Sequence, residues 1–275
     1  MLKPLRAKYP NATIDLHTSV TYGDAFNNLK LVDNIIRHPS VDKHSALHLA
    51  TIIPQHLKNS NYDLVLNPHP MYNNDKWSCS QHQELGENLI FAWVRALEDN
   101  NIPYNLPLET QLVLDEHEIA KVAAYREVAT TMAIRKNYLM EIMGESGQSF
   151  WNGEWTKSVI SFLLENRDCN VFVSVRNLPD EISKFQLKYP GRVFWAGSLS
   201  IRECAELFNY CQCFFSVSSG LSNACNTNWC RQDVQWVEVV NSLVCSSAAI
   251  RQHGKIFWHH NNVQDFIEML RQNNI

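Results

Sequence analysis

The 275-residue sequence is poor in the residues that usually separate domains, with nine glycines and ten prolines. No linker, low-complexity segment or internal repeat stands out. No uninterrupted apolar run approaches the roughly 20 residues that a helix needs to cross a bilayer, so we expect no transmembrane segment. No apolar stretch follows the positive charges of residues 1–6 either, and we therefore expect no signal peptide.

Charged residues and nucleotide-binding motifs are also scarce. Charged residues make up 19% of the chain and the net charge at pH 7 is −4, which argues against a generally basic surface and a nucleic-acid partner. Neither the P-loop pattern GxxxxGKS/T nor the dinucleotide pattern GxGxxG occurs. Apolar residues, at 45%, are sufficient for a normal core. The length suits two domains of about 100–150 residues each.

The eight cysteines lack the two closely spaced pairs of a typical zinc site. Cys225 and Cys230, with Cys211 and Cys213 nearby, are a possible zinc or iron site, but we expect small apolar core residues instead. In a large chain without an export signal, the thiols are expected to be reduced and the protein cytoplasmic. The remaining cysteines are Cys79, Cys169, Cys204 and Cys245.

The C-terminal half alternates predicted strands and helices, which indicates βαβ units and a parallel sheet. Ser200 and Glu203 form a predicted capping box at the start of one helix. The expected strands are residues 138–143, 170–175, 193–195 and 213–217, and the expected helices are residues 155–165, 180–187, 200–209 and 265–271.

The N-terminal half is less regular. A helix is predicted at residues 2–8 and an amphipathic helix at residues 83–98. Another helix is expected at residues 115–125, with Asp115 as its N-cap. The expected strands are residues 12–17 and 62–67, and residues 29–36 form either a short helix or a strand.

Small and polar residues follow the strand predicted at residues 213–217. Parallel sheets bind ligands beyond the carboxyl ends of their strands. Gly220 would allow close approach of the backbone, and helical N–H groups with the hydroxyls of Ser218, Ser219 and Ser222 would form a socket for phosphate oxygens. The alternative is an ordinary turn followed by an N-cap.

Two further polar segments follow strands of the same predicted sheet. Residues 144–153 include Ser146 and Gln148, which would face the same crevice unless this is a simple strand-to-helix loop. Asp180 or Glu181 could accept hydrogen bonds from ribose hydroxyls. Alternatively, these two acids only stabilise the amino end of a helix.

Residues 196–208 (AGSLSIRECAELF) and residues 214–224 (FFSVSSGLSNA) follow a known pattern. In order, they resemble the helix beginning sLxExA and the loop DSG or DTGxSHxA of the heptosyltransferase-like glycosyltransferases, family 9. Residues 5–15 (LRAKYPNATID) are similar to the LRxxYPxAxID segment of that family. Residues 32–36 and 62–65 fit the elements that follow it.

This resemblance implies a GT-B-like α/β fold, in which two Rossmann-like lobes with parallel sheets face a cleft. We expect an acceptor-side lobe at residues 1–129 and a nucleotide-sugar-binding lobe at residues 130–275. The loop backbone would hold the diphosphate, and Asp180 or Glu181 corresponds by position to the acid that contacts ribose. The nucleotide-sugar-binding residues expected are Ser146, Gln148, Asp180, Glu181, Ser218, Ser219, Gly220, Leu221, Ser222 and Asn223.

The sequence departs from the family pattern at places that matter for catalysis. The family has a first strand and a GDxxxxtP loop with a proposed catalytic Asp, and this sequence begins after both, so a shortened N-terminal lobe is expected. Ser218 and Asn223 stand where the family has Asp and His. The lysine after the first C-terminal strand has no match either. Asp15 and Asp24 are then the candidates for the catalytic base.

Three functions remain open on this basis. The leading one is metal-independent transfer of a sugar from a nucleoside-diphospho-sugar to a glycan, lipid or protein acceptor, in which a carboxylate deprotonates the acceptor hydroxyl. A second is a non-catalytic nucleotide-sugar- or glycan-binding member that pairs with an active transferase or with itself. A third is a transferase whose start lies upstream of Met1.

Overall fold

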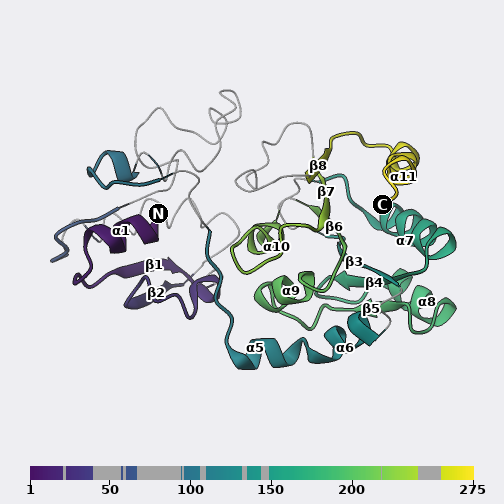
Figure 1. The fold of residues 1–275 in the computed structure, drawn as a ribbon, viewed down its shortest axis with the longest axis horizontal. Helices are drawn as coiled ribbons and strands as arrows, with labels where there is room; N and C mark the ends of the chain where they lie inside the picture. The colour runs from purple at the N-terminus through teal and green to yellow at the C-terminus, as the bar shows by residue number, and fades with distance from the viewer. Residues whose placement is uncertain are drawn as a thin grey trace. The chain divides into compact units, whose positions relative to one another are not determined.

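The computed structural model describes residues 1–20, 23–39, 57, 60–66, 94, 96–105, 110–131, 135–143, 149–217, 219–240 and 255–275. The chain divides into two compact units, Met1–Glu109 and Thr110–Ile275 (Figure 1). Among the helices that the structure describes, none is both long and apolar enough to cross a membrane.

The N-terminal unit contains a two-stranded parallel sheet of β1 (Asp15–Ser19) and β2 (Asn34–His38). In its register Asp15 lies opposite Asn34, and Ser19 opposite His38. Helix α1 (Leu2–Lys8) precedes the sheet, and the short 3-10 helix η1 (Gly23–Phe26) connects its strands. A small apolar cluster of Val94, Leu97 and Ile102 packs against residues of α1.

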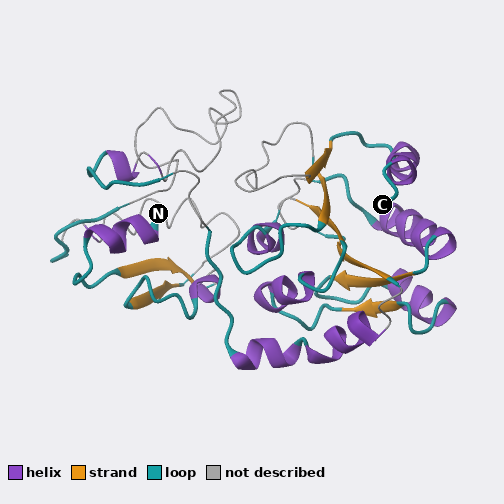
Figure 2. Ribbon diagram, viewed as in Figure 1, coloured by secondary structure: helices purple, strands orange, loops and turns teal. Residues whose placement is uncertain are grey.

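The C-terminal unit is built on a six-stranded sheet in which each neighbouring pair is parallel (Figure 2). The strand order is β5-β4-β3-β6-β7-β8. The strands are β3 (Lys136–Glu141), β4 (Cys169–Ser174), β5 (Val193–Trp195), β6 (Cys213–Val217), β7 (Gln235–Val239) and β8 (Lys255–Trp258).

Helices cover both faces of this sheet, as the mostly apolar strands and the buried central ones require. Alternate residues of each strand point to opposite faces, so Tyr138 and Met140 join one core while Leu139 joins the other. The first core is completed by α7 (Gly153–Asn166), α8 (Asp180–Lys188) and α11 (Val263–Gln272). The second is completed by α5 (Glu116–Lys121), α6 (Ala123–Thr131), α9 (Ile201–Phe208) and α10 (Gly220–Cys225).

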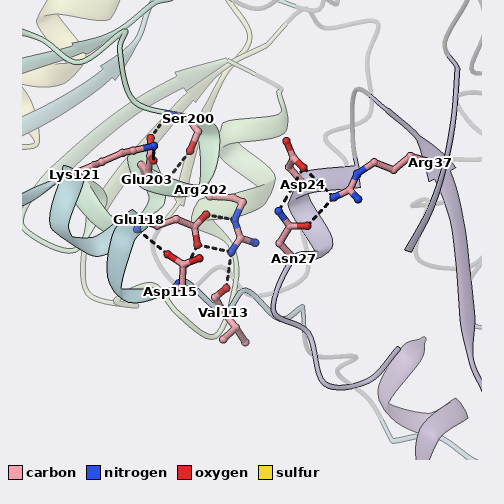
Figure 3. A network of polar contacts seen from close by, with 10 residues as sticks. All are labelled: Asp24, Asn27, Arg37, Val113, Asp115, Glu118, Lys121, Ser200, Arg202 and Glu203. Carbon is pink, nitrogen blue, oxygen red and sulfur yellow. Dashed lines mark hydrogen bonds and ion pairs between the residues drawn. The ribbon is translucent and has the colours of Figure 1, made fainter. Parts of the chain in front are cut away.

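The segment that carries α5 is bound to the C-terminal unit by polar contacts (Figure 3). The buried guanidinium of Arg202 donates from Nε to Oε1 of Glu118 at 2.5 Å and from Nη2 to Oε2 at 2.8 Å. Lys121 forms a 2.9 Å ion pair with Glu203. These contacts join α5 to α9 and give a physical reason why the C-terminal unit begins at Thr110. The boundary expected at residues 129/130 falls inside α6.

Most elements expected in the C-terminal half are present, and β5 and β6 have the expected bounds. The Ser200–Glu203 capping box and the N-cap at Asp115 are also present. Strands β7 and β8 were not anticipated. The strand expected at residues 62–67 is wrong, because residues 62–66 form no regular element and residue 67 lies outside the described residues.

Candidate functional site

The direction in which strands are added to the large sheet reverses between β3 and β6. From β3 the chain continues through β4 to β5 on one side, and β6, β7 and β8 are then added on the other. The helices after β3 and β6, α7 and α10, consequently pack on opposite faces of the sheet. This is the topological switch point, where ligands bind in parallel α/β sheets. The described part of the candidate loop, residues 219–223, lies at this point.

Ser219 is the N-cap of α10. Its Oγ accepts hydrogen bonds from the backbone N–H groups of Leu221 and Ser222, both at 3.1 Å. The hydroxyl of Ser222 donates to the Ser219 carbonyl at 2.9 Å and accepts from the Ser219 N–H. The two hydroxyls therefore form the N-cap of α10, as the alternative interpretation of this loop predicts. Ser222 is also buried, at 1% exposure.

Among the described residues of the loop, Gly220 and Asn223 are exposed and Ser219 is half-buried. Asn223 donates from Nδ2 to the Ser219 carbonyl at 2.9 Å. A Cβ atom at Gly220 would lie 3.2 Å from Cδ1 of Ile201, the tip of a half-exposed side chain. Leu221 points into the core and is 2% exposed. Ser218 lies outside the described residues.

Glu141, the last residue of β3, is a member of this site that sequence reasoning missed. Its Oε2 accepts a 2.7 Å hydrogen bond from the hydroxyl of Ser219. The side chain is buried, and the loss of hydration raises the pKa of Glu141 to about 8, although the bonds from Ser219 and the Val217 N–H oppose the shift. The carboxyl is therefore mostly protonated at neutral pH. A glutamate at the end of an apolar strand was the available signal.

Polar side chains continue from Glu141 across the neighbouring strands. Ser216 of β6 accepts a 2.7 Å hydrogen bond from Nε1 of Trp236. Glu238 of β7 is fully buried and forms an ion pair with Lys255 of β8. Burial lowers the pKa of Lys255, while Glu238 opposes this shift. The carboxyl edge of the sheet thus carries a buried polar row on the face that packs against α9 and α10.

Asp180 and Glu181 are the first two residues of α8 and both are exposed. Strand β4, which precedes α8, is separated from β6 by β3 alone. Two strand spacings correspond to about 10 Å along the edge, which leaves room for a ribose and two phosphates. The helix-charge and ribose-binding interpretations both fit this position. Ser146 and Gln148 lie outside the described residues.

The structure places Asp15 and Asp24 at different points of the N-terminal unit. Asp15 is the first residue of β1, and its carboxylate accepts hydrogen bonds from Tyr62 at 2.6 Å and Asn34 at 2.7 Å. These two bonds lower the pKa of Asp15. Asp24 lies in η1 beyond the end of β1 and forms a 3.0 Å ion pair with Arg37 (Figure 3). The two carboxylates do not share a partner in these contacts.

The six cysteines that the structure describes are free thiols and all are buried. Burial raises the pKa of Cys204 to about 12, which keeps the thiol protonated. Cys79 and Cys245 lie outside the described residues. Over the described ranges, no three His, Cys, Asp or Glu side chains are grouped so that they could hold a metal ion.

No protein-family model matches the chain, and no curated protein matches its sequence. Solved structures do match it. The glycosyl transferase family 9 structure from Veillonella parvula covers 99% of this chain and 86% of its own, with a TM-score of 0.65 and 13% identity. The ADP-heptose LPS heptosyltransferase II of E. coli covers 100% and 94%, with a TM-score of 0.59 and 14% identity.

A third match is the E. coli heptosyltransferase WaaC with ADP, which covers 100% of this chain and 95% of its own at a TM-score of 0.57 and 12% identity. At such identities the likeness concerns the fold. The expected fold class is confirmed: the chain is a mixed α/β protein with parallel sheets, and its fold is that of the family 9 and heptosyltransferase structures.

Proposed function

We propose that this protein is a glycosyltransferase that binds a nucleoside-diphospho-sugar at the carboxyl edge of its C-terminal sheet. It would transfer the sugar to a glycan, lipid or protein acceptor. The observation that carries the proposal is a fold shared over the full length of the chain with enzymes named for ADP-heptose or solved with ADP. The switch point between β3 and β6 supports the location of the site.

The loop chemistry supports a diphosphate more specifically. Because the hydroxyls of Ser219 and Ser222 are committed to the cap, the backbone N–H of Gly220 and the side chain of Asn223 would contact the phosphates. The Glu141 carboxyl behind Ser219 is mostly uncharged at neutral pH, so it would not repel an anion. Asp180 or Glu181 would accept hydrogen bonds from the ribose hydroxyls.

Calorimetric titration with ADP, UDP and GDP tests the site. We expect Gly220→Val to weaken binding of the preferred nucleotide at least tenfold, about 1.4 kcal/mol, because the new side chain would occupy the phosphate position. The variant should fold, since the nearest atom is the flexible tip of Ile201. Glu181→Gln should weaken the binding of the nucleotide, because Glu181 would contact only the ribose. It should leave the affinity for inorganic diphosphate unchanged.

The control is Leu187→Val, which places a valine at an 84% exposed position near the carboxyl end of α8, away from the carboxyl edge of the sheet. It should retain full affinity. Nucleotide binding by Gly220→Val equal to that of the parent would refute the site. Binding of a sugar nucleotide without transfer to any of a panel of glycans would favour the non-catalytic alternative.

A further inference from the structure

A chain of four hydrogen-bonded side chains crosses the small sheet of the N-terminal unit. The hydroxyl of Tyr62 lies 2.6 Å from Oδ2 of Asp15 and 3.1 Å from Nε2 of His17. Nδ1 of His17 in turn lies 2.9 Å from Nε2 of His38. The chain therefore runs from a carboxylate at the start of β1 to a histidine at the end of β2.

The protons along this chain can point in only one direction when both histidines are neutral. Tyr62 has a single hydroxyl proton and donates it to Asp15, so its oxygen must accept from Nε2–H of His17. Nδ1 of His17 is then an acceptor, and Nε2–H of His38 donates to it. The unprotonated nitrogen at the far end is Nδ1 of His38.

The ring geometry agrees with this assignment. The planes of His17 and His38 differ by 23° and their centroids are 5.1 Å apart, as expected for a hydrogen bond in the ring plane. His38 is the last residue of β2 and half-buried, at the carboxyl edge of the parallel pair. Among the described residues, nothing donates a hydrogen bond to its Nδ1.

The charges around the chain favour an ionised Asp15. Hydrogen bonds from Tyr62 and Asn34 lower the pKa of Asp15, while the nearby Asp33 raises it slightly and is itself paired with Arg6. Burial and then His38 lower the pKa of His17, whereas Asp15 raises it. A charged carboxylate connected through hydrogen bonds to a histidine whose burial favours its neutral form is the arrangement found behind general bases.

We propose that His38 is the general base of the proposed sugar transfer and that His17, Tyr62 and Asp15 are its positioning residues. This inference rests on the proposed function. Nδ1 of His38 takes the proton of the acceptor hydroxyl, and the acceptor oxygen forms a bond to the anomeric carbon. The bond from that carbon to the diphosphate breaks, and its electron pair leaves with the nucleotide. The imidazolium at His38 is stabilised by Asp15 through Tyr62 and His17, and later loses its proton to water.

In this proposal His38 is the base and Asp15 is a positioning residue. Both of its carboxylate oxygens already accept hydrogen bonds, and it lies at the amino end of β1. Asp15 is connected to the carboxyl edge of the sheet by hydrogen bonds that pass through intervening side chains. These side chains are Tyr62, His17 and His38, and their hydrogen bonds couple the carboxylate to the far end of the chain.

The proton assignment is testable without any substrate. Long-range ¹H–¹⁵N NMR spectra at pH 8 should show His17 and His38 both as Nε2–H tautomers. Tyr62→Phe should change the ¹⁵N shifts of His17 and His38. Tyr104→Phe, which removes a comparable 2.5 Å bond to Glu98 in the same unit, should not. An Nδ1–H tautomer at His17 would overturn the relay.

The catalytic role is tested with ADP-heptose as donor and a panel of glycan acceptors. His38→Gln should lower kcat at least about 100-fold, the usual contribution of a general base, with ADP affinity unchanged within twofold. Tyr62→Phe should lower kcat about tenfold and shift the acidic limb of its pH profile. His117→Gln, an exposed histidine on α5, is the control and should retain full kcat.

The outcomes separate this inference from the proposed function. A parent protein that binds ADP and transfers sugar, with full kcat in His38→Gln, would overturn the base and leave the transferase standing. A parent that binds no nucleotide would overturn the proposed function and the base together, and the NMR spectra would still decide whether the relay exists.

Discussion

The two units place carboxyl groups at their parallel sheets in opposite environments. Glu141, in the C-terminal unit, is 7% exposed, and burial raises its pKa to about 8. Asp15, in the N-terminal unit, is far less buried, and two hydrogen bonds lower its pKa. Thus one acid holds its proton at neutral pH while the other stays charged.

This contrast suggests a division of labour. Under the two proposals above, the protonated acid beside the candidate phosphate loop would tolerate an anionic ligand, whereas the charged acid hydrogen-bonded to Tyr62 would support proton removal by His38. Titratable groups whose pKa values are driven apart are a common mark of acid and base roles in enzymes. Breaking each polar arrangement should therefore have different consequences in the two units.

The largest loss of stability expected from a single substitution comes from the buried ion pair of the C-terminal unit. Arg202→Ala leaves the Glu118 carboxylate and the Val113 carbonyl without their guanidinium partner. We expect the free energy of unfolding to fall by about 3 kcal/mol, because removing one partner of a buried pair leaves the other charge buried without a partner. Urea denaturation monitored by circular dichroism measures this.

The control for this change is Arg231→Ala. Arg231 pairs with Asp233 in the same unit, but the two side chains are 40% and 71% exposed. A loss of no more than about 1 kcal/mol is expected there. Equal losses in the two variants would mean that burial does not set the strength of these pairs.

A second prediction concerns the pH dependence of stability at Glu141. Its pKa is about 8 in the folded protein against a reference value of 4.5, so between these pH values only the folded state keeps the proton. The contribution to stability is full below pH 4.5 and is lost as the pH rises to about 8. Glu141→Gln cannot ionise and avoids this loss.

The free energy of unfolding of Glu141→Gln, minus that of the parent, should therefore increase with pH and level off above about pH 8. We expect a total change of about 5 kcal/mol, because the two pKa values, about 8 and 4.5, differ by about 3.5 and each unit corresponds to about 1.4 kcal/mol. Denaturation curves at several pH values give this difference, and Glu181→Gln supplies the baseline for removing one exposed carboxyl. A difference independent of pH would show that folding does not raise the pKa of Glu141.

The elements of the C-terminal sheet were predictable where apolar runs alternate with capped amphipathic helices, as at β5, β6 and α9. Strands β7 and β8 were missed because charged residues interrupt their patterns. Glu238 and Lys255 are compatible with a buried sheet only as partners, and that pairing is visible only in three dimensions. Local sequence patterns do not show that a buried charge is neutralised by a partner on another strand.

The candidate site was likewise predictable only where its residues have local sequence signals. The small residues after β6 identified the loop, since a strand end and an N-cap have local signals. The partner of Ser219, Glu141, lies 78 residues away in sequence, and no local pattern joins the two. The chain from Asp15 to His38 likewise depends on the register of β1 and β2 and on Tyr62, from a segment that was wrongly expected to be a strand.

The smallest expected effect comes from the half-exposed ion pair of the N-terminal unit. Arg6 donates to Asp33 at 2.6 Å and to the Ala12 carbonyl at 2.7 Å, and thereby joins α1 to the start of β1 and β2. The two side chains of the pair are 20% and 48% exposed, so water can replace much of what is lost. We expect Arg6→Ala to cost about 1 kcal/mol, and hydrogen exchange to accelerate in α1 while the large sheet is unchanged. The Asp33 carboxylate keeps its 2.7 Å bond from the Ile14 N–H, which limits the damage. A loss as large as that of Arg202→Ala would remove the contrast between the two units.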